Sequence, residues 1–139
     1  MIMSHVLGST EAITATQQTL RHNFQRTDAT HVSVDQNKTS LTGTGGRLEL
    51  GKNGGGNWRY NGGLIWRSPE LELNDVGFLR RTDEIIQFGN LRYLWQIPTD
   101  VYRNINVGFE QNAFYDFGGN LNRARFEIGG EVSWINNWW

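Results

Sequence analysis

Residues 68–84 concentrate charged side chains that could do chemistry. Paired carboxylates act as acid and base in glycoside hydrolysis, and carboxylate oxygens are ligands that calcium prefers. Hydrolysis needs a cleft with a fixed separation between two carboxyl groups, and this spacing matches no standard calcium loop. The preferred interpretation is a solvated surface loop without a chemical role, which can fold over or into the barrel. A surface hydrolase stays an alternative, with these candidate residues: Glu70, Glu72, Asp75, Arg80, Arg81, Asp83 and Glu84.

Other kinds of chemical site have no support in the sequence. His5, His22 and His31 lack the spacing of a metal-binding pair on a helix, and the chain has no cysteine to join them. No serine lies in a GxSxG turn, and Gly51-Lys52 belongs to no phosphate-binding loop. The net charge of -1, without a basic run, argues against a nucleic-acid partner. We therefore expect no metal, no cofactor and no nucleic acid, and a role other than catalysis is favoured.

The elements around these residues show the alternation of β-strands, most clearly in residues 120–134. Phe126, Ile128 and Trp134 occupy one face of an extended chain, whereas Arg125 and Glu127 occupy the other. One face is apolar and the other is ionic. Either a soluble sheet buries the apolar face in a core, or lipid covers that face and the charged side chains line a wet interior.

Turn residues divide the rest of the chain into an all-β, antiparallel up-and-down meander. Glycines at 53–56 and at 118–119 suit hairpin turns, and the proline-containing stretch 97–100 interrupts two further runs. About five strands are predicted, at residues 40–52, 57–67, 85–96, 102–117 and 120–135. Residues 1–38 are expected to form a loop region on the extracellular side, in which residues 11–20 are one helix or part of a strand. Residues 39–139 are expected to form a β-barrel segment.

Several features favour a partial transmembrane β-barrel in a bacterial outer membrane. Short turns are expected at one end of the strands and mostly longer loops at the other, and about eleven tilted residues per strand span roughly 25 Å of hydrocarbon. No run of eighteen apolar residues is present, so no helical span is expected. Aromatic residues recur at strand ends, as in the girdles of such barrels: Trp58, Tyr60, Trp66, Tyr93, Trp95, Tyr102 and Trp134. The predicted lumen charges are Arg59, Arg67, Glu110, Arg123, Arg125, Glu127 and Glu131.

Two interpretations of these side chains stay open. The lumen charges would either pair and solvate the interior, which is favoured, or set the selectivity of a pore. The tryptophans would either form the girdle, which is favoured, or stack on sugars in a soluble carbohydrate-binding sheet. The expected function is a structural segment of the barrel, related to a pore or to uptake. Its expected partners are outer-membrane lipid and the remaining strands of the same barrel, with a saccharide as a further candidate.

Several stretches resemble a known bacterial family: EAITATQ at 11–17, FQRTDA at 24–29, TSLTG at 39–43, and GGGNWRYNGGLIWRSPELELNDVGFLRRTDEI at 54–85. In that family a periplasmic domain similar to family-nine carbohydrate-binding modules precedes a large outer-membrane β-barrel domain of unknown function. The family usually has Pro where this chain has Thr27 and Gly where it has Glu70. The resemblance implies that the chain is a fragment of the barrel, since about eight strands are the minimum for closure.

Overall fold

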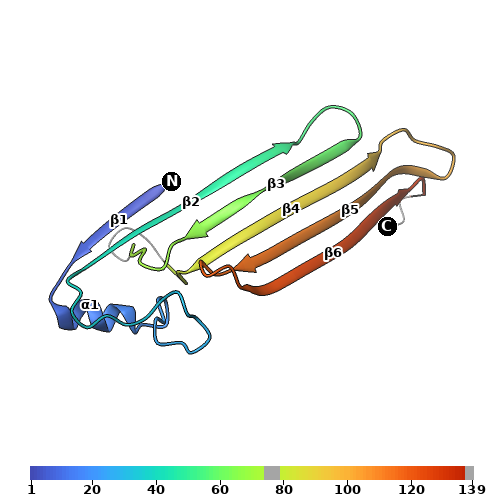
Figure 1. Ribbon diagram of the computed structural model, residues 1–139. Coiled ribbons are helices and arrows are strands. Elements are labelled where there is room, and N and C mark those ends of the chain that lie inside the picture. The colour runs from blue at the N-terminus through green and yellow to red at the C-terminus, as the bar shows by residue number, and fades with distance from the viewer. Residues whose placement is uncertain (74–78, 137–139) are drawn as a thin grey trace. The chain divides into compact units, whose positions relative to one another are not determined.

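The computed structural model describes residues 1–73 and 79–136, and β-strands make up most of them. Figure 1 shows the strands side by side in chain order. The elements are β1 (Ile2–Leu7), α1 (Thr10–Gln17), β2 (Ser40–Lys52), β3 (Trp58–Arg67), β4 (Glu84–Trp95), β5 (Tyr102–Tyr115) and β6 (Leu121–Trp134). Each strand neighbours the next along the chain, in the order β1-β2-β3-β4-β5-β6. The predicted all-β antiparallel meander is confirmed.

Residues 1–73 and 79–136 contain six strands, so the prediction of about five was one strand too low. The additional strand, β1, pairs antiparallel with the first half of β2, from Ile2 opposite Gly45 to Leu7 opposite Ser40. No hairpin turn connects these two strands, because α1 and a long connection lie between them. A six-residue strand without an adjacent turn therefore gave no hairpin signal in the sequence.

The sheet has two edges within the described residues. β1 and β6 stand at opposite ends of the strand order and each has one neighbour, so these strands do not close into a barrel. β1 does not pair with β6. In the described part of the chain, no helix is long and apolar enough to cross a membrane.

The tight turns form where glycine can adopt positive φ. Gly55 and Gly56, between β2 and β3, have φ values of 71° and 68°, and Gly119, between β5 and β6, has a φ of 85°. A residue with a Cβ atom rarely adopts this backbone conformation. The glycines that predicted these turns are therefore the residues that make them.

The chain divides into two compact units. Unit 1 comprises Met1–Arg47, Ile65–Ile86 and Phe114–Asn122, and unit 2 comprises Leu48–Leu64, Gln87–Ala113 and Arg123–Trp139. Unit 1 has an apolar core, made of Ile13, Phe24, Ala29, Leu41, Leu71 and Leu79. In the described part of unit 2, Ala113 alone is a buried apolar residue. The large apolar side chains of unit 2 are thus left largely at the surface.

Candidate functional site

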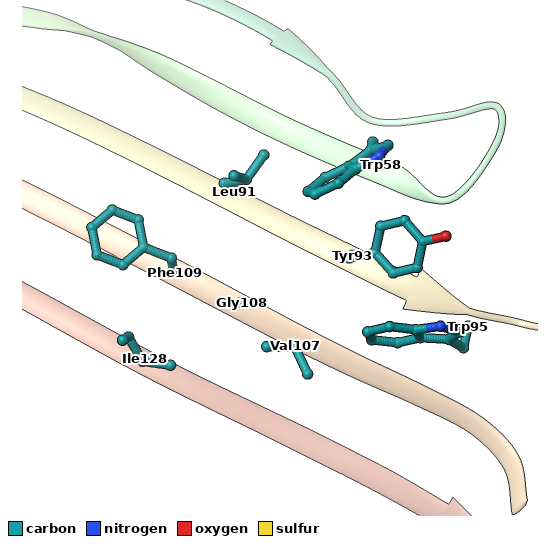
Figure 2. Close-up of a pocket in the computed structure, with 8 residues that line it drawn as sticks. All are labelled: Trp58, Leu91, Tyr93, Trp95, Val107, Gly108, Phe109 and Ile128. Atoms are coloured by element: carbon teal, nitrogen blue, oxygen red, sulfur yellow. The ribbon is translucent and has the colours of Figure 1, made fainter.

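Unit 2 presents an extended apolar face that no other described segment covers. Figure 2 shows part of this face as a hollow, with side chains from four neighbouring strands. Its lining residues are Trp58 on β3, Leu91, Tyr93 and Trp95 on β4, Val107, Gly108 and Phe109 on β5, and Ile128 on β6. Ile128 is 79% exposed and nearby Phe126 is 67% exposed. A contiguous apolar surface of this kind usually marks a site for a protein, a ligand or a membrane.

Aromatic rings order one part of this face. The Tyr93 ring lies edge-on to Trp58, with ring centroids 4.7 Å apart, and edge-on to Trp95, with centroids 4.4 Å apart. Phe109 stacks on Phe126 across β5 and β6 at 6.4 Å. These arrangements are favourable for the ring quadrupoles. The structure thus brings three predicted girdle residues together in one cluster.

The other face of unit 2 carries a repeated polar contact between neighbouring strands. An asparagine amide on one strand donates to a glutamate on the next in each of three pairs. The pairs are Asn61 with Glu49 at 3.0 Å, Asn90 with Glu110 at 2.7 Å, and Asn106 with Glu131 at 3.2 Å. Asn90 and Leu91 are adjacent in β4, so strand geometry directs their side chains to opposite faces. Unit 2 is therefore a two-faced sheet, apolar on one side and polar on the other.

The other four predicted girdle residues lie outside this aromatic cluster. Trp66 belongs to unit 1, where its indole occupies the space that a Cβ atom on Gly46 would need. Tyr60 and Trp134 are exposed on β3 and β6, and Tyr102 is half-buried at the start of β5. These four residues are not among those that line the hollow.

Among the predicted lumen charges, several have partners other than each other. Arg59 donates to the carbonyls of the turn before β3, including that of Gly56 at 2.8 Å. Arg67 belongs to unit 1 and pairs with Glu84 at 2.7 Å. Arg125 pairs with Glu127 on the same strand, and Arg123 is exposed on β6. Glu110 and Glu131 accept from the asparagines already described.

Residues 68–73 are folded over β2, and all of them except the buried Leu71 are half-buried. Leu71 is 1% exposed and its backbone passes directly over Gly43, where a Cβ atom would overlap it. Ser68 accepts from the Thr44 amide at 2.8 Å, and Glu70 accepts from the Thr42 amide at 3.0 Å. These side-chain oxygens thus satisfy two backbone amides of β2.

The candidate catalytic carboxylates are therefore engaged in structural contacts. Glu70 also pairs with Lys38, and Glu72 lies 3.8 Å from Arg21 and 3.9 Å from His22. Arg80 and Arg81 are exposed, and Asp75 lies outside the described residues. The described residues contain no group of three or more histidine, aspartate or glutamate side chains arranged to hold a metal.

His22 is buried between α1 and the segment that covers β2. Its Nε2 lies 3.2 Å from the Leu71 carbonyl, which can only accept, so Nε2 is the atom that donates there. Burial lowers the pKa of His22 below its ordinary value of 6.5, although the charge of Glu72 opposes this shift. The neutral ring is thus the form that the folded protein favours.

A second buried polar cluster holds three parts of unit 1 together, and we call it the Asp83 clasp. Its members are Arg26, His31, Asp83 and Asp116. The Asp83 carboxylate accepts from the Arg26 guanidinium, from His31 Nε2 at 2.9 Å and from the Phe117 amide at 2.9 Å. Asp83 is 2% exposed and has a φ of 52°, in the left-handed region. One carboxylate thus joins the connection after α1, the start of β4 and the turn after β5.

Asp116 completes the clasp at the turn between β5 and β6. It lies 3.7 Å from Arg26 and accepts from the Asn120 amide at 2.9 Å and the Asn120 side chain at 3.0 Å. Burial alone would raise the pKa of Asp116, but the hydrogen bonds from Asn120 and the charges of His31 and Arg26 lower it below 3.8. The folded protein therefore favours the ionised carboxylate.

Sequence reasoning did not single out the clasp as a site. Arg26 is separated from Asp83 by 57 positions and His31 by 52, so no local spacing indicates that they meet. One signal was available, because Arg26 lies in FQRTDA and Asp83 lies in the string 54–85. Both stretches carry the family resemblance.

In the comparison with protein families, residues 7–138 match a family described as Domain of unknown function (DUF5916). The chain belongs to the DUF5916 family. The comparisons with curated proteins and with solved structures give no match. The DUF5916 match covers α1 and β2 to β6, and it includes the clasp and the two-faced sheet. The expected resemblance to a domain of unknown function is thereby confirmed.

Proposed function

We propose that this DUF5916 chain is a structural segment of a bacterial outer-membrane β-barrel. The observation that carries the proposal is the exposed apolar face of unit 2, which runs from Trp58 on β3 to Ile128 on β6. In water this exposure would be costly and would promote aggregation. In a membrane the same face lies against lipid, and the polar face with its Asn–Glu pairs lies toward water.

Strand length and aromatic placement support the proposal. β5 and β6 each contain 14 residues. At about 3.3 Å per residue and a tilt of about 45°, such strands span roughly 33 Å, close to the thickness of a hydrocarbon core. Trp58, Tyr93 and Trp95 cluster where β3 begins and β4 ends. Amphipathic rings of this kind favour the membrane–water interface.

The two bare edges define the partners in this proposal. Unpaired strand edges present hydrogen-bonding groups that are very costly in lipid, so barrels leave no edge. We infer that β1 and β6 pair with further strands of the same barrel, with lipid around them. The barrel would serve a pore or uptake, and the carbohydrate-binding domain that the resemblance implies makes a saccharide the first solute to test.

Adjacent cysteine variants test which solvent each face contacts. The chain has no cysteine, so Ile128→Cys and Glu127→Cys each add a single reactive site to it. Each variant is labelled with an environment-sensitive fluorophore in outer membranes from cells that produce the protein. Lipids with a nitroxide on the acyl chain should quench the label at position 128 and leave the label at 127 largely unquenched.

A second pair on β4 and a fractionation provide the controls. Leu91→Cys and Asn90→Cys should repeat the contrast on a different strand. The labels should become indistinguishable after unfolding in urea. Equal quenching at 127 and 128, or recovery of the protein in the soluble fraction, would overturn the proposal.

A further inference from the structure

The Asp83 clasp buries several charged side chains inside unit 1. Asp83 and Asp116 are both at most 3% exposed, and the Arg26 side chain is 11% exposed. A buried ionic cluster contributes little net stability relative to an apolar one, but removing one partner is strongly destabilising, because the remaining charge is left buried. Such a cluster can hold two parts of a fold together while all its partners are present and release them when one partner is lost.

The clasp fastens residues 21–38, which we call the strap. The other contacts that the strap makes with the rest of unit 1 are mainly polar. The Arg21 carbonyl accepts from the Thr82 amide at 3.1 Å, and the Asp35 amide donates to Gln17 at 2.7 Å. Phe24 and Ala29 are its buried apolar residues. A segment with few buried apolar contacts is a candidate for local opening.

The strap lies over the segment that covers β2. His22 of the strap contacts the Leu71 carbonyl, and Leu71 lies over Gly43 and Gly45 of β2. Opening of the strap would therefore uncover the Leu71 segment, which covers the unit 1 part of β2.

We propose that the Asp83 clasp is a latch, and that the strap opens as one local unit when the latch is released while β3 to β5 stay folded. This inference goes beyond the proposed function and does not rest on it. The opening itself is a property of unit 1 and can be measured without reference to a membrane role.

Asp83→Asn is the variant that releases the latch. Asparagine tolerates the left-handed backbone conformation at position 83, so the change removes the charge that binds Arg26 without adding backbone strain. The matched control is Glu84→Gln, at the next position, which removes one partner of the less buried Arg67–Glu84 pair.

Hydrogen exchange of the full protein in detergent or in membranes is the primary measurement. In Asp83→Asn the amides of residues 21–31 should exchange about a hundredfold faster than in the unaltered protein, as expected when a buried ion pair loses one partner. Amides of β3 to β5 should be unchanged, and Glu84→Gln should leave residues 21–31 unchanged. Trypsin cleavage after Arg21 and Arg26 should rise in parallel.

Two results would overturn the latch. One is unchanged exchange in residues 21–31, and the other is faster exchange throughout all strands, which indicates a structural role for the whole fold. If Asp83→Asn does not fold, Gly118→Ala gives the same test, because its Cβ atom would overlap the His31 ring without altering any charge. Failure of the latch leaves the contrast between positions 127 and 128 intact, so it is distinguishable from failure of the proposed function.

Discussion

The backbone of Leu71 crosses β2 directly over Gly43, so closely that the crossing requires a residue without a Cβ atom at position 43. The contact links two parts of unit 1 that are far apart in the sequence. It also explains why Leu71 is almost completely buried although it follows a strand as part of a connection. Glycine here serves the close approach of two backbones.

Gly43→Ala should therefore displace residues 68–73 from β2. The added methyl group would overlap the Leu71 backbone, which cannot move aside as a flexible side chain would. We therefore expect the free energy of unfolding to fall by about 3 kcal/mol. Gly54→Ala is the matched control, because its Cβ atom would have nothing within 4 Å. Urea unfolding of both proteins measures the difference. Equal midpoints would show that the crossing adapts.

Tyr93→Leu should lower stability by about 1 kcal/mol, because two edge-to-face ring contacts are lost while an apolar side chain is kept. The control is Tyr60→Leu, at an exposed tyrosine of β3. Tryptophan fluorescence during urea unfolding reports both the stability and the surroundings of Trp58 and Trp95. A larger loss for Tyr60→Leu than for Tyr93→Leu would contradict the role assigned to the cluster.

His22 should make the protein less stable in mild acid. Its pKa is lowered in the folded state, so the unfolded chain binds the proton first as the pH falls. The stability linked to His22 is thus fully present above pH 6.5 and declines as the pH falls from there through the lowered folded value. In His22→Gln the unfolding free energy should depend less on pH across this window. An unchanged slope would show that folding does not lower the pKa of His22.

Asp116 should affect the stability of the protein in stronger acid than His22 does. Its folded pKa lies below its ordinary value of 3.8, so its contribution to stability is present above pH 3.8 and is lost as the pH falls through the folded value. Asp116→Asn should flatten the pH dependence of the unfolding free energy below pH 3.8. Thermal unfolding at a series of pH values measures this, and a steeper dependence in the variant would contradict the assignment.

Local patterns predicted much of the sheet. The five predicted strands match β2 to β6 to within two residues at every end, because glycine turns and alternating side chains are local signals. β1 was missed because its partner in β2 is remote in the chain and no turn joins them. Of the predicted girdle residues, Trp58, Tyr93 and Trp95 cluster and Trp66 lies in unit 1, and the girdle itself stays a prediction.

The sequence by itself determined the order of the strands, their turns and the two faces of β6, because each depends on residues that are neighbours along the chain. Only the tertiary structure decided which charged residues meet. Glu70 holds Lys38, and Asp83 gathers Arg26 and His31, through contacts that span more than thirty positions of the chain. Charge and spacing cannot specify such pairs in advance, because burial selects among many possible partners only when the chain has folded.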